Sequence, residues 1–319
     1  MTNFQVYKKT LSFSLLMFVV GLIVMVIIAL TCTAGFFIGQ NIDADIGAII
    51  GLIIGLIIGI IAASLINIFI NNRIKAAQTA IMVKGVTEDN LPDHAFKEGF
   101  NEIKGRFGRI TGFYFITRAI KGIFRQLGRG LNRVGRVVGG QTGDSITSAI
   151  DSAIQVLVGY LCDCCLGWIL FRKDQNVARA GCEGAVIFFK HGKTLIRNVG
   201  RIFGMGFLSL LVIGGAIFGL SYLIFNQFPG MFETLSQTLI NAGSEAEFIN
   251  DPQLLMIYVC ALIGVILWSI LHSVLIRPFI LVGVMRNYMA AGQKDMPKES
   301  DFAELANKSP RFAKLSKSI

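Results

Sequence analysis

The chain has 319 residues, of which 53% are hydrophobic and only 16% are charged, and its formal net charge at pH 7 is +10. Because soluble domains carry about 25% charged residues, this composition excludes an ordinary soluble protein and predicts an integral membrane protein. A basic excess is typical of cytoplasmic loops that contact anionic lipid. No DNA- or RNA-binding motif accompanies it, so no nucleic-acid partner is expected.

A first membrane span is predicted within the uncharged stretch between Lys9 and Asp43. Residues Ser12 to Ile38 are enough to cross about 30 Å of hydrocarbon with some tilt. The short connection from Gln40 to Ile46 has two acids and no base, which is typical of the outer side. A second span is predicted from about Ile46 to Ile70.

Small residues recur at every fourth position of this second span. The row consists of Gly47, Gly51, Gly55, Gly59 and Ala63. A spacing of four puts them on one side of a helix, where another backbone can approach closely. The partner is either the first span, which offers Gly21, or the same helix of a second subunit in a homo-oligomer. Packing within one chain is the favoured interpretation.

A basic region follows, in which the chain is expected on the cytoplasmic side. From Lys104 to Gly140 there are nine Lys or Arg residues and no acid. Apolar residues fall at alternating spacings of three and four from Ile120 to Val138, which predicts an amphipathic helix. The basic residues expected to bind the phosphates of anionic inner-leaflet lipid are Arg118, Lys121, Arg125, Arg129, Arg133 and Arg136. A solvated linker is the alternative.

The next apolar run, Ile154 to Phe171, is long enough to suggest a further span, but basic groups lie on both sides of it. The positive-inside rule disfavours a crossing. We therefore expect residues Ser152 to Phe171 to re-enter the membrane from the inner side or to lie in its interface. If Phe107 to Ile123 crossed as well, six spans would result; four is the preferred number.

Four cysteines mark this part of the chain: Cys162, Cys164, Cys165 and Cys182. Cys162 and Cys165 have the CxxC spacing common at zinc sites, but the second pair is missing and the surrounding run is apolar. A packing role is favoured over a metal site, and acylation is the alternative in a eukaryotic host. No metal or other cofactor is expected.

The third span is predicted at about Phe203 to Phe225. It carries a second small-residue contact point, Gly215 and Gly219. The loop from Asn226 to Pro252 has acids but no base, which places it outside, and a short helix is predicted within it at Met231 to Asn241. The last apolar run extends from Leu254 to Val284, and basic residues follow it.

The sequence thus predicts an all-α polytopic membrane protein with four spans, inner-side amphipathic helices and both termini in the cytoplasm. Loop charges agree with this topology at every crossing, acidic outside and basic inside. Three regions are expected. They are an N-terminal helical hairpin at residues 1–72, a basic inner-side region at residues 73–151, and a cysteine-marked membrane region with two spans and a tail at residues 152–319.

One charged residue lies inside the last apolar run, Arg277, with Pro278 next to it. An arginine at this depth is costly against lipid, so it is expected to face protein, to face a cavity or to reach the inner phosphates. Pro278 permits a kink, and a broken helix beside a charge is frequent at transport sites. Arg277, Pro278, Ser273 and His272 therefore form a candidate substrate path. Snorkelling of Arg277 to lipid phosphates is the alternative.

A series of motifs in the second two-thirds of the chain has a characteristic order. The motifs are Gly112-Phe113-Tyr114-Phe115-Ile116-Thr117-Arg118, Cys162-Asp163-Cys164-Cys165, Arg172-Lys173-Asp174-Gln175-Asn176, Ala180-Gly181-Cys182-Glu183-Gly184-Ala185 and Asn198. From about Gly112 to Leu315 this order resembles the C-terminal half of the choline transporter-like family. The resemblance implies a transporter fold in this half. The family has acidic residues in its last span where this chain has Ser273 and Arg277, so choline itself is not implied as substrate.

Two functional hypotheses follow from these features. The first is a transporter or channel-like protein that moves a small polar or charged solute past Arg277. The alternative is a non-transporting membrane subunit, or a lipid-organising protein, that binds anionic lipid through the basic helix. No phosphate loop, H-E-x-x-H or G-x-S-x-G motif is present, so neither a catalytic residue nor an enzyme activity is expected.

Overall fold

The computed structural model describes residues 1–42, 46–89, 91–106, 108, 110–114, 117, 119–123, 143–241 and 247–317. Regular structure in these ranges is helical, with no strand. Four helical segments are long and apolar enough to span a membrane, namely Asn3–Gln40, Gly47–Thr87, Ile202–Phe225 and Pro252–Lys294. The predicted all-α polytopic membrane protein with four spans is confirmed.

The chain divides into two compact units. The first comprises residues 1–198 and 281–319, and the second comprises residues 199–280. The boundaries predicted near residues 72 and 151 both lie inside the first unit. Each unit contains one hairpin of two apolar helices.

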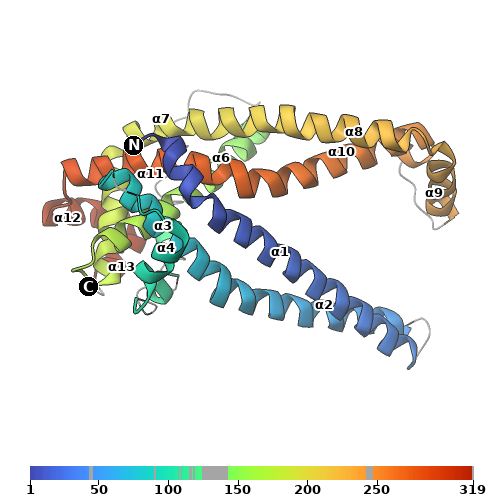
Figure 1. Ribbon diagram of the computed structural model, residues 1–319, viewed down its shortest axis with the longest axis horizontal. Coiled ribbons are helices and arrows are strands. Elements are labelled where there is room, and N and C mark those ends of the chain that lie inside the picture. Colours follow the sequence, from blue (N-terminus) through green and yellow to red (C-terminus); the bar gives the residue numbers. More distant parts are fainter. Residues whose placement is uncertain are drawn as a thin grey trace. The chain divides into compact units, whose positions relative to one another are not determined.

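In the first unit, α1 (Asn3–Gln40) and α2 (Ile46–Ile66) lie side by side (Figure 1). Their backbones touch along the glycine row, in the pairs Gly39 with Gly47, Gly35 with Gly51, and Thr31 with Gly55. A Cβ on Gly35, Gly39, Gly51 or Gly55 would overlap the carbonyl oxygen of its partner. The row therefore lies against the C-terminal half of α1. A Cβ on Gly21 would meet nothing within 4 Å, so Gly21 is not the partner.

α2 continues without a break into the rest of the first unit. It passes through η1 (Asn67–Asn71), a π-helical turn in which the amide of Asn72 donates to the carbonyl of Asn67, and then becomes α3 (Asn72–Thr87). Large apolar side chains are exposed as far as Ile70, whereas all residues from Ala76 to Val83 are buried. Exposed apolar surface of this kind fits lipid, and the buried stretch packs within protein.

The remaining helices of the first unit pack into a bundle, called the helical body below. It consists of α3, α4 (Ala95–Ile103), α6 (Gly143–Phe171), α7 (Val177–Ser209) as far as Asn198, α11 (Arg277–Lys294) from Leu281, α12 (Glu299–Lys308) and α13 (Pro310–Ser316). α6 forms its core, because every residue from Leu161 to Leu170 is buried. Glycines permit the close packing: a Cβ on Gly167 would press on Met285, and one on Gly292 would press on Trp168.

This arrangement surrounds the apolar run before Phe171 with protein. Its apolar part, Gln155–Phe171, is too short to count among the four candidate spans. Its residues Leu161 to Leu170 are buried in the core of the helical body, and the expected re-entry into the membrane or position in its interface stays a prediction. A helix surrounded by lipid and a helix surrounded by protein are both apolar on all sides. The periodicity of the sequence therefore does not distinguish a membrane segment from a buried core helix.

The second unit is also a helical hairpin (Figure 1). Its helices are the end of α7, η2 (Leu210–Gly214), α8 (Gly215–Phe225), α9 (Pro229–Asn241), η3 (Glu247–Ile249), α10 (Pro252–Leu271) and η4 (His272–Ile276). α9 matches the short helix expected in the loop, and its Phe232 packs in a cluster with Leu255, Met256 and Cys260. α10 begins where the Asp251 carboxylate accepts hydrogen bonds from the amides of Gln253 and Leu254.

In this second hairpin the two long helices approach each other closely at Gly214, one residue before the predicted contact residue Gly215. A Cβ on Gly264 of α10 would lie 3.1 Å from the carbonyl oxygen of Gly214. A Cβ on Gly215 or Gly219, the predicted contact point, would instead meet nothing within 4 Å.

The glycine contact of the first hairpin makes a direct prediction. Gly51→Ala places a methyl group against the Gly35 carbonyl and should lower the free energy of unfolding by about 1–3 kcal/mol, the usual range for overpacking. Reversible unfolding of the full-length protein in detergent, followed by circular dichroism, measures this loss. Gly21→Ala is the matched control and should be neutral or slightly stabilising, because alanine is the better helix former. Equal stability of the two variants would contradict the contact.

Candidate functional site

Polar side chains enclosed by apolar helices are the candidates for function in this protein, because burying them is costly unless they are paired. Within the described residues, one group lies in the hairpin of the second unit and others lie in the helical body of the first unit. A further group joins Gln78 of α3 to α1, where its amide donates to Ser14 Oγ at 2.8 Å.

In the second unit, three polar side chains meet between the two long helices. The Trp268 indole donates to Ser209 Oγ at 3.1 Å, and the Ser209 hydroxyl donates to the Gly206 carbonyl at 2.8 Å. The His272 ring lies 5.1 Å from the Trp268 ring, centroid to centroid. A Cβ on Gly206 would lie 3.8 Å from His272 Nε2, in ordinary van der Waals contact, so the imidazole also lies close to this turn of α7.

A π-helical turn lies beside this group on each helix. η2 begins directly after Ser209, and η4 begins at His272. Pro278 gives a physical reason for η4: its ring crowds the carbonyl four residues earlier and it has no amide hydrogen, so a wider turn relieves the helix. In η4 the amide of Arg277 donates to the His272 carbonyl, five residues back.

The four residues of the predicted path have different surroundings. His272 is half-buried and contacts Trp268. Ser273 is exposed, and its hydroxyl donates to the Ile270 carbonyl at 2.8 Å. Arg277 is half-buried and Pro278 is buried. His272 belongs to the polar group, whose other members, Ser209 and Trp268, were not singled out from the sequence.

In the helical body, a carboxylate of the Cys-Asp-Cys-Cys motif is paired with a lysine. The Asp163 side chain is 6% exposed, and its Oδ1 lies 2.5 Å from the ammonium of Lys75 on α3. Tyr114 stands close by, and its hydroxyl is 3.5 Å from the Asn72 carbonyl. Burial, reinforced by the negative charge of Asp163, raises the pKa of Tyr114, so its phenol stays protonated.

A second carboxylate joins α6 to α7. Glu183, whose side chain is 5% exposed, accepts a hydrogen bond from the Trp168 indole at 2.9 Å and lies 3.7 Å from the Arg172 guanidinium. Next to this pair, the Tyr288 hydroxyl donates to the Gly184 carbonyl at 2.7 Å and lies 3.5 Å from Cys165 Sγ.

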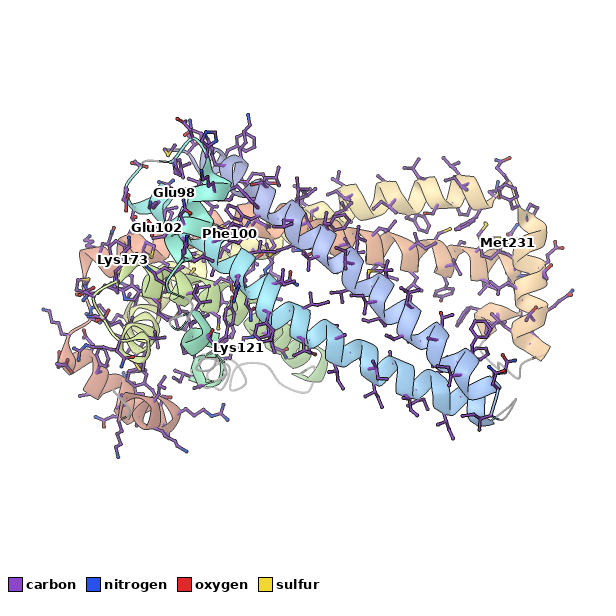
Figure 2. The ribbon with its side chains drawn as sticks, turned by 60° about the horizontal axis from the view of Figure 1, so that its bottom comes forward. Glu98, Phe100, Glu102, Lys121, Lys173 and Met231 are labelled. Atoms are coloured by element: carbon purple, nitrogen blue, oxygen red, sulfur yellow. The ribbon has the colours of Figure 1, made fainter. Side chains whose placement is uncertain are left out.

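Near the surface of the helical body, three cations surround one carboxylate. Glu102 of α4 lies 2.8 Å from Lys84, 3.3 Å from Arg106 and 3.5 Å from Lys173, with Glu98 alongside (Figure 2). Partial burial raises the pKa of Glu102, but the Lys84 hydrogen bond and the neighbouring positive charges outweigh this effect, so its pKa lies below the ordinary value.

The cysteines of the motif, and Cys182 after it, are buried thiols outside any disulfide. Burial raises the pKa of the Cys164 and Cys165 thiols, and it raises that of Cys182 to about 12. Thiols so far from ionisation are poor nucleophiles and poor metal ligands. Among the described residues, no group of three or more His, Cys, Asp or Glu side chains is placed to hold a metal ion.

Most of the predicted lipid-binding helix lies outside the described residues. This applies to Arg118, Arg125, Arg129, Arg133 and Arg136. Lys121 is described and is exposed (Figure 2).

The fold and these polar groups define an all-α integral membrane protein that combines two apolar hairpins with a helical body. Comparison with protein-family models, with characterised proteins and with solved structures finds no match.

The buried pair predicts a strong effect of removing one partner. Lys75→Met leaves the Asp163 carboxylate without its ammonium and should cost about 2–4 kcal/mol of unfolding free energy. Lys308→Met removes an exposed partner of Glu304 and should cost at most about 1 kcal/mol. The double variant Lys75→Met/Asp163→Leu should recover most of the loss. If the double variant stays as unstable as Lys75→Met, the unpaired Asp163 carboxylate is not the cause of the lost stability.

The Glu102 cluster predicts how acid destabilises the helical body. Because the pKa of Glu102 is lower in the folded than in the unfolded protein, its contribution is full above the ordinary glutamate pKa and is lost as pH falls through the folded value. The thermal midpoint should therefore fall below about pH 4. Glu102→Gln should flatten this fall, and Glu88→Gln, an exposed control, should not. If the thermal midpoints of the two variants depend on pH in the same way, the Glu102 cluster is not the cause of the acid destabilisation.

Proposed function

We propose that the protein moves a small polar or charged solute across the membrane through the hairpin of the second unit. The observation that carries the proposal is the polar group Ser209, Trp268 and His272, enclosed by two candidate spans. Polar side chains within apolar spans are expensive and commonly line pathways for substrates or ions.

The two π-helical turns beside this group support the proposal. Such turns occur frequently at functional sites, and they release carbonyls from the regular helical ladder. Backbone that departs from α-helix at membrane depth is tolerated only in protein or along a water-filled path. In η2 and η4 this departure coincides with the polar side chains.

Arg277 supplies the charge in this proposal. A guanidinium cannot lose its proton in a protein, so it would favour an anionic or neutral solute and oppose a cation. The resemblance to the choline transporter-like family belongs to the same proposal. An arginine in place of the family's acidic residues would give a related fold a different preference for solute charge.

A flux experiment tests the proposal. The full-length protein is reconstituted in liposomes, and uptake of a small organic anion and of a small organic cation of similar size is compared. Arg277→Glu should change the anion-to-cation uptake ratio by at least about ten-fold, since one reversed charge near the path acts on both solutes. Lys294→Glu, an equal reversal at an exposed site, should leave the ratio unchanged.

Two outcomes would contradict the proposal. If the wild-type protein carries neither solute nor inorganic ions, it is not a transporter, and the non-transporting membrane subunit becomes the better explanation. If Arg277→Glu transports with the wild-type ratio, transport takes another path.

A further inference from the structure

A surface groove of about 590 Å³ lies where the first turns of α1 meet the turn that leads into α4. Its polar walls are Lys8, Lys9, Ser12, Asp93, His94 and Lys97. All of these side chains are exposed, so the groove is open to a ligand from outside. It lies entirely within the first unit and belongs to none of the polar groups described above.

The charges around the groove leave a positive excess. Lys9 is matched by Asp93: its ammonium lies 3.9 Å from the Asp93 carboxylate and donates to the Asp93 carbonyl at 3.3 Å. Lys8 and Lys97 have no ion-pair partner in the part of the chain that the structure describes. Two ammonium groups are therefore available to an anion.

The backbone adds to this preference. α4 begins beside the groove, with His94 at its N-cap position and no side chain that caps its first amides. Free amides and the positive end of the helix dipole favour a negative group at such a terminus.

The position of the groove along α1 can be compared with the start of the helix's exposed apolar surface. After Phe4 near its start, α1 exposes no large apolar side chain until Leu15, and from there such side chains recur as far as Ile38. At 1.5 Å per residue, Lys8 lies about 10 Å from Leu15 along the helix axis. A lysine stem can bridge that distance to the headgroup layer, which extends about 5–8 Å beyond the hydrocarbon.

We propose that this groove binds the phosphate of an anionic phospholipid. Lys8 and Lys97 hold the phosphate and the net negative charge of the headgroup, the α4 amides donate to a phosphate oxygen, and the acyl chains lie along the exposed apolar residues of α1. A zwitterionic headgroup carries its own cation and gains less from the two lysines. The site shares no residue with the solute path or with the basic region after Lys104.

Ligand-induced thermal stabilisation of the full-length protein in detergent tests the proposal, because a ligand that binds only the folded state raises the midpoint with its concentration. The probes are dihexanoyl phosphatidylglycerol, dihexanoyl phosphatidylcholine and inorganic phosphate. Phosphatidylglycerol should stabilise the wild type most strongly. In Lys8→Gln/Lys97→Gln, its apparent Kd should rise by at least about ten-fold, since two charge-assisted contacts are lost.

Lys294→Gln/Lys314→Gln is the matched control, because it removes the same charge from two exposed lysines elsewhere in the first unit. It should keep the wild-type response. If the first variant has a lowered midpoint without ligand, Lys97→Gln alone replaces it, with a rise in Kd of at least about three-fold. Equal responses of test and control variants would overturn the site. Equal stabilisation by inorganic phosphate would overturn the lipid assignment.

Discussion

Burial of Leu161 to Leu170 of α6 on every side is the constraint on which the helical body depends. A helix enclosed in this way cannot leave its polar groups to water, so each must be matched by a neighbour. Asp163 is matched by Lys75 of α3, and Glu183 of α7 is matched by the Trp168 indole of α6. These pairs fix the rotation and height of α3 and α7 against α6. Apolar packing alone would fix the rotation and height of α3 and α7 less strictly, because the hydrophobic effect is not directional.

The long helices then connect this body with the membrane. α2 passes into α3 through η1, and α10 passes into α11 through η4. A π-helical turn adds a residue to one turn, which rotates everything beyond it by about 100° about the helix axis. One continuous helix can therefore present its glycine row or apolar face to a membrane partner and a different face to the helical body. Breaking the helix would instead expose unpaired backbone groups near the membrane.

Sequence patterns predicted the four spans and the loop helix well, because length and the absence of charge are enough for such segments. They missed the partners of the glycine row, although Gly35 and Gly39 have the same spacing of four as the row they meet. They also missed Ser209 and Trp268. In an antiparallel hairpin, residues equally far from the loop lie level. Ser209 precedes Asn226 by 17 residues (226 − 209), and Trp268 follows Asp251 by 17 (268 − 251). Apolar periodicity cannot show such pairs, since it describes one helix at a time.

The pattern of exposed apolar side chains also indicates how deep in the membrane Arg277 lies. Exposed large apolar side chains on α10 end at Leu267, and from Pro278 onward most residues of α11 are buried. Arg277 therefore lies near the end of the lipid-facing surface, where a guanidinium is far less costly than at the bilayer centre. A charge at that position acts on a solute at the mouth of a path, before its water is removed. His272 and Ser209 lie on the Leu267 side of Arg277, deeper in the hairpin. In the proposed path, selection by charge would thus precede selection by hydrogen bonding.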